Sequence, residues 1–228
     1  MQYPGYWQSN FIAYLLQTKQ TKIDPKIIPQ RTKTDFVNSV ICLAHLNTWS
    51  IDTIAATSFA TKWYVGRLRP EEMAFKIATG EVSHGVPIDI LQKVQSMNLL
   101  SAEEFTAYPE GCPRHPSWPA MHSAASSMSL WMAVVCDMTD EQLYQAKLTD
   151  HAVAYSRSIA GVHYMDDNIA GLKLGQELLA RLLPDYLAQT YGADPDVVRE
   201  KVARHRFDWS EFDRELFENK GYFARSSD

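Results

Sequence analysis

Lysine, arginine and histidine recur in three short segments of the chain at spacings that suit the binding of an anion. The first segment is KWYVGRLRP, in which six residues separate Lys62 from Arg69 and Pro70 follows directly. On a helix, cations at this spacing lie about two turns apart on one face, so both can reach one anion. Taken alone, such a pair is more often two solvated surface cations.

The second segment, HPSWPAMHSAASS, brings His122 to the expected start of a helix through a proline-rich loop. Free backbone amides at a helix start bind anions, so the amides of Met121 and His122 are expected to meet the same anion. The small residues from Ser123 to Ser127 predict close helix packing beneath the site. The alternative is a loop histidine that makes a structural hydrogen bond.

The third segment, SRSIAGVHYMDDN, contains Ser156, Arg157, His163 and Asp167. His163 and Asp167 are one helical turn apart, so the carboxylate can accept the Nδ1 proton of the imidazole and leave Nε2 free. The alternative is an ion pair on a helix surface.

Taken in order, the three segments resemble the signature of the vanadium-dependent haloperoxidase and type 2 acid phosphatase superfamily, over about residues 38–180. The resemblance implies that Lys62, Arg69 and Arg157 hold the oxygens of vanadate or phosphate. It also implies that His163 ligates vanadium or attacks phosphorus, and that His122 is the acid or base on the opposite side. Asp167 would orient His163 by accepting its Nδ1 proton.

One part of the second segment resembles a particular branch of that superfamily. The run HPSWP, which begins at His115, is similar to HPSYP in algal and cyanobacterial bromoperoxidases, where this histidine lies behind the groups that touch the anion. Ser156 is likewise expected to lie behind the groups that touch the anion. Ala120 and Met121 stand where the family usually has Ser-Gly. Loss of the serine hydroxyl is expected to weaken oxyanion binding by roughly tenfold or more.

The function that these resemblances imply is a vanadate-dependent haloperoxidase that oxidises bromide or iodide with hydrogen peroxide to hypohalous acid. His122 would assist deprotonation of the peroxide and Lys62 would polarise it. Two alternatives remain open. The first is a phosphomonoesterase that acts on a small phosphoester through a phosphohistidine at His163. The second is a degenerate oxyanion-binding domain without catalysis, suggested by Ala120 and Met121.

Helices are the elements expected to position these residues, because apolar residues recur at helical spacing and hairpin signals are absent. The sequence therefore predicts an all-α helical bundle of the vanadium haloperoxidase and acid phosphatase type. The predicted helices span about 35–48, 51–66, 70–79, 87–97, 119–137, 140–157, 164–190, 195–206 and 210–219.

Other local signals mark the boundaries of these helices. Ser101 with Glu104 and Thr139 with Gln142 fit the capping box. Pro70 and Pro195 suit first-turn positions. The segment 108–119, with four prolines and one glycine, predicts a loop.

Length and composition predict one globular domain over residues 1–228, since the chain is 46% hydrophobic and 21% charged. The net charge of −5 is dispersed, which argues against nucleic acid as a partner. An apolar stripe near the C-terminus, including Trp209 and Phe212, predicts packing on the core or on a neighbouring subunit, so a homo-oligomer is left open.

The cysteines and the apolar segments bear on the compartment. The three cysteines, Cys42, Cys112 and Cys136, are widely spaced, which argues against a disulfide framework or a thiolate zinc site. The sequence shows neither a secretory signal nor an apolar stretch of the roughly 20 residues that a bilayer requires. We therefore expect a cytoplasmic protein without membrane insertion.

Overall fold

The computed structural model describes residues 10, 12–13, 22–29, 36–108 and 110–218, and these fold almost entirely into helices. The helices are α2 (Phe36–Val65), α3 (Pro70–Ala78), α4 (Ile88–Ser96), the 3₁₀ helix η1 (Ala102–Phe105), α5 (Met121–Ala125), α6 (Met128–Val135), α7 (Asp140–Ile159), α8 (Met165–Tyr191), α9 (Pro195–His205) and α10 (Trp209–Glu218). The predicted all-α class is confirmed. A two-stranded antiparallel sheet, β1 (Lys22–Ile23) with β2 (Cys136–Asp137), was not predicted.

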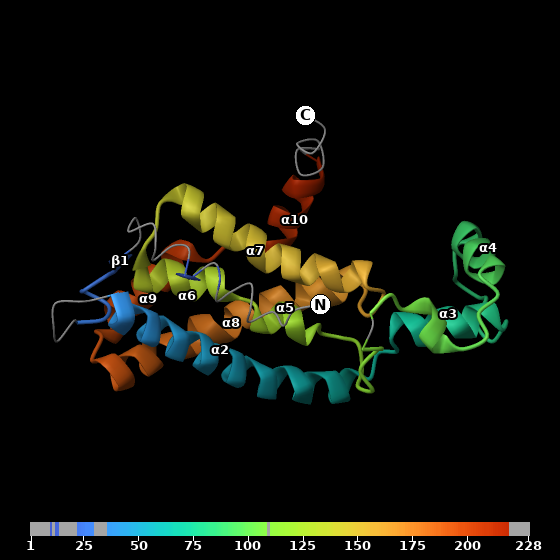
Figure 1. Cartoon of the computed structure of the whole chain (residues 1–228), viewed down its shortest axis with the longest axis horizontal. Coiled ribbons are helices and arrows are strands. Elements are labelled where there is room, and N and C mark those ends of the chain that lie inside the picture. Colours follow the sequence, from blue (N-terminus) through green and yellow to red (C-terminus); the bar gives the residue numbers. More distant parts are fainter. Residues whose placement is uncertain (1–9, 11, 14–21, 30–35, 109, 219–228) are drawn as a thin grey trace.

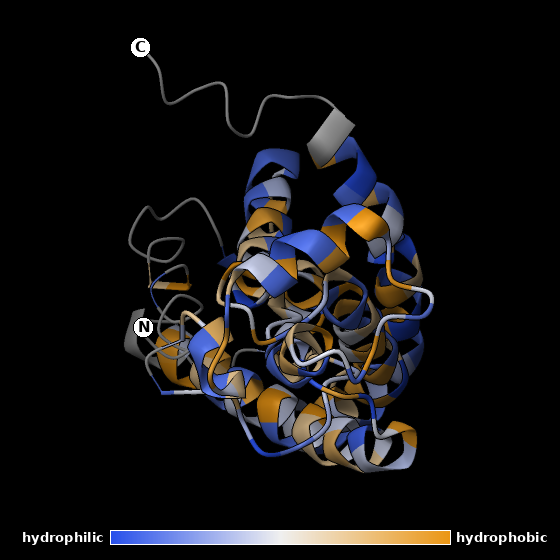
Figure 2. Cartoon of the chain, turned by 90° about the vertical axis from the view of Figure 1, so that its right-hand side faces the viewer, coloured by the Kyte–Doolittle hydropathy of each residue, from blue (hydrophilic) through white to orange (hydrophobic). Residues whose placement is uncertain are grey.

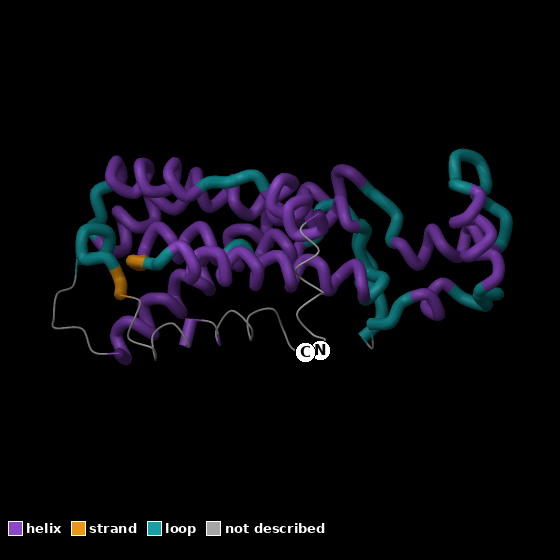
Figure 3. Tube along the Cα trace, turned by 90° about the horizontal axis from the view of Figure 1, so that it is seen from above, coloured by secondary structure: helices purple, strands orange, loops and turns teal. Residues whose placement is uncertain are grey.

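Helix α8 is the central element of the bundle, because it packs against α2, α5, α6, α7, α9 and α10. Figure 1 shows α2 and α7 along opposite sides, with α5, α6 and α8 between them. Helices α3 and α4 extend beyond one end of the bundle, as the view from above also shows (Figure 3). Lys62, in the last turn of α2, and Arg69, directly before α3, therefore lie where the bundle joins this extension.

The main core lies around α6, in which every residue is buried. Its neighbours contribute apolar side chains such as Leu46 of α2, Leu183 of α8 and Val198 of α9. Figure 2 looks along the bundle and shows hydrophobic and hydrophilic residues alternating around the helices, as amphipathic helices require. A smaller cluster around Trp209 and Phe212 packs α10 onto the bundle, which agrees with the first of the two predicted roles of the C-terminal stripe.

Helix α2 is one continuous helix of 30 residues, whereas the sequence predicted two helices with a break near Trp49 and Ser50. The prediction of a break was wrong because residues 36–65 contain no glycine or proline. Ser50 is buried on the core side of the helix rather than in a turn.

The single helix predicted over 119–137 is divided into α5 and α6, and its last residues pair as strand β2. At the break, Ser127 leaves the helical region with ψ 57°. The carboxylate of Asp150, on α7, accepts the amides of Met128 and Ser129 at 3.3 and 3.0 Å. A buried carboxylate from another helix therefore caps the N-terminus of α6. No pattern in the neighbouring residues predicts this cap.

The two predicted capping boxes have different outcomes. Thr139 and Gln142 form a capping box at the start of α7, with bonds of 3.0 and 3.2 Å. At η1 the prediction was wrong, because Glu104 accepts the amide of Leu100 at 2.9 Å rather than that of Ser101. Pro70 and Pro195 begin α3 and α9 as predicted.

Close packing of α5 is confirmed, and two glycines of α8 make it possible. A Cβ at Gly171 would lie 2.3 Å from the carbonyl oxygen of Ala120, and one at Gly175 would lie 2.2 Å from that of Ala124. The backbones of the two helices touch where the side chains are absent. This contact fixes the start of α5, and with it His122, against the start of α8, where Asp167 lies.

None of the helices in the described ranges combines the length and the apolar character needed to cross a bilayer. The predicted loop is present ahead of α5, and its backbone is tied to distant elements. Ser117 donates its amide to the carbonyl of Arg67 at 2.8 Å, and Ala120 donates to that of Asp167 at 2.9 Å. The loop therefore has a defined path between the ends of α2 and α8.

Candidate oxyanion site

The three sequence segments meet at the end of the bundle next to α3. Lys62 comes from the last turn of α2, Arg69 precedes α3, and His122 lies in the first turn of α5. Arg157 lies near the end of α7, and His163 lies in the connection to α8. The structure thus brings together residues that are about 100 positions apart in the chain.

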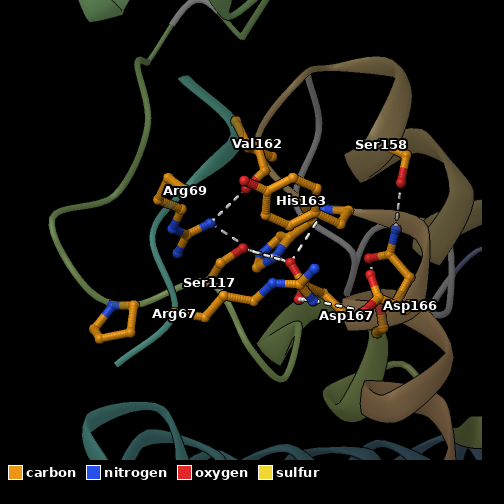
Figure 4. Close-up of polar contacts among 12 residues, drawn as sticks. Arg67, Arg69, Ser117, Ser158, Val162, His163, Asp166 and Asp167 are labelled. Atoms are coloured by element: carbon orange, nitrogen blue, oxygen red, sulfur yellow. Dashed lines mark hydrogen bonds and ion pairs between the residues drawn. The ribbon is translucent and has the colours of Figure 1, made fainter. Parts of the chain in front are cut away.

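His163 is held at both ring nitrogens (Figure 4). Its Nδ1 lies 3.2 Å from Oδ2 of Asp167, and its Nε2 lies 3.0 Å from Nη1 of Arg69. Because arginine can only donate, Nε2 accepts and Nδ1 carries the proton. Burial, followed by the charges of Arg69 and Lys62, lowers the pKa of His163 to about 3, although Asp167 opposes this shift. The imidazole is therefore neutral, with its lone pair on Nε2 directed at the cations.

Asp167 is a fully buried carboxylate with a donor on every side. Arg67 donates to Oδ1 at 2.7 Å, and the amide of Tyr164 donates to Oδ2 at 3.1 Å. The Ser117 hydroxyl also donates to Oδ2. Burial alone would raise the pKa of Asp167, but the hydrogen bonds from His163 and Ser117 hold it below its ordinary value. The group is therefore an ionised acceptor that orients His163.

Arg69 is fixed by three neighbours besides His163. Its Nε donates to the carbonyl of His115 at 2.9 Å, its Nη1 to that of Val162 at 2.8 Å, and its Nη2 to Nδ1 of His115 at 3.0 Å. Its amide donates to Glu72 at 2.9 Å, which fixes the turn into α3. Arg69 is thus a buried guanidinium whose direction the loop and the α7–α8 connection determine.

Lys62 is fully buried, and its ammonium group donates to the carbonyls of Pro116 and Ser117 at 3.1 and 2.8 Å. Burial, followed by the charge of Arg69, lowers the pKa of Lys62 to about 7. Gly66, with φ +67°, ends α2 one turn later and lets the chain turn back toward Arg69. The ammonium is therefore held at the site by a loop more than 50 residues away.

His122 and Arg157 complete the set of cations and histidines. Burial, followed by the charges of Arg157, Lys62 and Arg69, lowers the pKa of His122 to about 4. Arg157 is 4% exposed, and its guanidinium lies 4.5 Å from the ring centroid of Tyr108. After burial, the charge of Arg157 also contributes to the lowered pKa of Arg69, so His122 and Arg157 both interact electrostatically with the same group of cations.

The remaining predicted residues differ in how close they lie to this group. His115 touches it through Arg69, and its ring lies edge-on to Phe59 with centroids 5.1 Å apart. Met121 is the first residue of α5, while Ala120 is fully buried before it. The hydroxyl of Ser156 donates to the carbonyl of Val153 in its own helix at 2.7 Å, so this bond is local rather than directed at the site.

Several residues at the site had no predicted role. Ser117 and Arg67 both bind Asp167, and Tyr108 and Tyr164 lie under the guanidinium groups of Arg157 and Arg67. Ser117 and Arg67 lie inside segments that the sequence singled out, so their position next to the key residues was the signal. Tyr164 likewise lies in the third segment, directly after His163, whereas Tyr108 lies outside the three segments and gave no such signal.

The comparisons with known proteins show the family of the chain. A family model described as the PAP2 superfamily matches residues 46–190. This range contains every residue of the site described above. No curated protein and no solved structure matches the chain. The match does not distinguish the bromoperoxidase-like branch from the rest of the superfamily.

Proposed function

Because the chain belongs to the PAP2 superfamily, we propose that its cationic site holds vanadate and that the protein is a vanadate-dependent haloperoxidase. Its substrates are hydrogen peroxide and bromide or iodide. One peroxide, one halide ion and one proton give one hypohalous acid and one water, which balances atoms and charge. The superfamily includes phosphatases as well as haloperoxidases, so this choice rests on the properties of individual residues.

The observation that carries the proposal is the concentration of buried positive charge. Lys62, Arg69 and Arg157 are at most 4% exposed. The charge of Arg69, after burial, is a cause of the low pKa of Lys62, and Asp167 is already bound to Arg67. Buried like charges are costly unless an anion joins them. Two guanidinium groups and one ammonium group match the oxygens of vanadate or phosphate, so the residues fit either anion.

His163 supplies the nitrogen that would hold vanadate. Its Nε2 lone pair faces Arg69, and its Nδ1 proton is bound by Asp167. An arriving oxyanion would accept the Arg69 donor and leave this lone pair available for a bond. Bound vanadate supplies the Lewis acidity that activates peroxide toward halide.

The protonation state of His122 in the anion-free site suits the proton-accepting role that the peroxidase requires. With a pKa lowered to about 4 in the anion-free site, its imidazole is neutral at physiological pH. A neutral imidazole can accept a proton from hydrogen peroxide, whereas a phosphatase needs it to donate a proton to the leaving group. His115, bonded to Arg69, supports bromide or iodide as the halide through its resemblance to the bromoperoxidases.

A phosphomonoesterase is the second candidate, favoured by the same orientation of His163. A lone pair on Nε2, with Nδ1 bound to Asp167, also suits attack on phosphorus. Either bound oxyanion, phosphate or vanadate, would offset the charges of Lys62, Arg69 and Arg157 and thereby raise the pKa of His122, which would allow it to donate a proton to a leaving group. The third candidate, oxyanion binding without catalysis, follows from Ala120, which has no hydroxyl to offer the anion.

Parallel assays on the same protein preparation test these candidates. The protein is freed of bound oxyanion and then assayed for bromination of a phenolic dye with hydrogen peroxide and bromide, with and without orthovanadate. Hydrolysis of p-nitrophenyl phosphate is measured without vanadate. We expect bromination that requires vanadate and competes with inorganic phosphate. Phosphate ester hydrolysis alone would select the phosphatase, and oxyanion binding without either reaction would select the non-catalytic domain.

His163→Ala provides the site control for these assays. We expect it to abolish vanadate-dependent bromination and any hydrolysis, because one nitrogen serves both chemistries. His45→Ala, at an exposed position on α2, is the matched control and should retain the parent activity. Parent-level activity in His163→Ala would remove His163 from the proposed role.

A further inference from the structure

Ser117 is a fully buried residue of the second segment that contacts both of the other two segments. Its amide donates to the carbonyl of Arg67 at 2.8 Å, and its carbonyl accepts from the ammonium group of Lys62 at 2.8 Å. Its hydroxyl donates to Oδ2 of Asp167 and lies 3.3 Å from Nδ1 of His163. Figure 4 shows Ser117 between Arg69, His163 and Asp167.

The direction of these hydrogen bonds follows from the groups involved. The carboxylate of Asp167 can only accept, so the Ser117 hydroxyl gives its proton to that group. The hydroxyl oxygen is then free to accept, and Nδ1 of His163 lies within hydrogen-bond distance of both this oxygen at 3.3 Å and the carboxylate at 3.2 Å. The imidazole is thus held by two acceptors that are themselves joined.

We propose that Ser117 is the positioning residue of the site, whose hydroxyl fixes the imidazole plane of His163 and so aims Nε2 at the bound oxyanion. This inference rests on the proposed function, because it requires the Nε2 of His163 to bond to vanadium. The Ser117 hydroxyl acts through His163 and Asp167 and does not itself touch the anion. Its carbonyl keeps Lys62 in place through the backbone, which a side-chain substitution leaves intact.

Two anions distinguish aiming of Nε2 from general binding in the pocket. Orthovanadate can form a bond to Nε2, whereas inorganic phosphate at equilibrium is held by the cations through hydrogen bonds and charge. Removing the hydroxyl should therefore affect vanadate and leave phosphate unchanged. The typical loss of metal affinity when such an outer hydrogen bond is removed is about 10- to 100-fold.

The experiment measures dissociation constants of orthovanadate and inorganic phosphate by calorimetry at one pH for the parent, Ser117→Ala and Ser117→Thr. We expect Ser117→Ala to bind orthovanadate about 10- to 100-fold more weakly and phosphate as the parent does. Ser117→Thr, which retains a hydroxyl, should recover vanadate affinity. Retained phosphate binding also shows that the pocket of each variant is formed.

Ser50→Ala is the matched control, because Ser50 is equally buried in α2 and its hydroxyl makes no hydrogen bond within the described residues. It should bind both anions as the parent does. Equal vanadate affinity in Ser117→Ala and the parent would overturn the inference. Equal losses for vanadate and phosphate would also overturn it, because Ser117 would then support the whole pocket.

The His163→Ala variant separates failure of this inference from failure of the proposed function. If the parent binds orthovanadate and His163→Ala does not, His163 is the ligand, and the Ser117 variants then test positioning alone. If His163→Ala binds orthovanadate as tightly as the parent, the proposed function is wrong and the positioning role is overturned with it. A second readout is the side-chain ¹⁵N spectrum of His163 in the anion-free protein. The parent should show a single Nδ1-protonated form, and Ser117→Ala should show a broadened or mixed signal.

Discussion

Asp167 shows how much of the chemistry of this site depends on a residue that does not face the anion. Arg67, Ser117, His163 and the amide of Tyr164 all donate to it. An ionised carboxylate can accept all of these bonds, while a neutral amide presents only one oxygen. The direction of the Nε2 lone pair of His163 therefore depends on the charge of Asp167 as well as on its position.

Asp167→Asn is expected to lower the activity of the protein about 10- to 100-fold, because the amide nitrogen would face a donor and the histidine would lose its orienting charge. Asp166→Asn is the matched control, since Asp166 bonds Arg67 at 2.7 Å on the same turn and is 67% exposed. Steady-state rates of bromination, measured for the parent and both variants, test this prediction. Equal rates for the parent and Asp167→Asn would show that His163 needs no charged partner.

Lys62 makes oxyanion binding depend on pH. Its pKa is lowered to about 7 in the anion-free site, so it loses its proton, and with it one of the attracting charges, as the pH rises through that value. We expect the affinity for sulfate, whose charge is constant between about pH 5 and about pH 9, to fall across this range. A bound anion favours the charged lysine, so the decline should extend above the pKa of the free site.

Lys62→Arg is the control for this pH dependence, because arginine keeps its charge throughout the range. Its sulfate affinity should be flat above the pH at which the histidines titrate. Sulfate dissociation constants measured at several pH values provide the comparison. An unchanged pH profile in Lys62→Arg would assign the dependence to another group.

Among the contacts between helices, the one between α5 and α8 holds His122 and Asp167 in position relative to each other. Gly171 and Gly175 allow the backbones to touch, and the amide of Ala120 donates to the carbonyl of Asp167 at 2.9 Å across this contact. The relative positions of His122 and Asp167 therefore depend on these two glycines, because any larger residue would separate the helices.

Gly175→Ala is expected to destabilise the protein by at least about 1 to 3 kcal/mol, because its Cβ would lie 2.2 Å from the carbonyl oxygen of Ala124. Helix propensity alone predicts the opposite sign, a gain of about 1 kcal/mol when alanine replaces glycine within a helix. Urea unfolding of both proteins measures the difference. A more stable variant would mean that the two helices are not in backbone contact.

At the scale of the whole molecule, the second core cluster shares no residue with the site. Trp209 is 1% exposed and packs with Phe212, Leu172 and Ala154, which attaches α10 to the bundle. His151 supports the same attachment through a 2.7 Å contact with Asp213. Stability can therefore be changed here without touching the residues that surround the anion.

Trp209→Ala is expected to lower the free energy of unfolding by about 3 to 5 kcal/mol, since it removes a large buried ring. Provided that the variant is folded at the assay temperature, its affinity for sulfate should equal that of the parent. Urea unfolding and calorimetry on the same preparation test both statements. A large loss of sulfate affinity in the folded variant would show that α10 helps to shape the site.

The sequence alone determined the helical class, most helix boundaries and the residues that gather at the site. Helical periodicity and local caps such as Thr139 with Gln142 are short-range properties, so they can be read directly from neighbouring residues. The spacing of His163 and Asp167 likewise fixes a contact within one turn. The family match over residues 46–190 agrees with the superfamily that the motifs predicted.

Tertiary structure decided the features that depend on partners far away in the chain. Asp150 divides the predicted helix of residues 119–137, and the glycines of α8 set the depth of α5. Ser117 binds Lys62 and Asp167, which are 55 and 50 positions away. A hydrogen bond between distant segments exists only after the chain has folded. The sequence therefore indicates which residues can do chemistry, and packing determines which neighbours orient them.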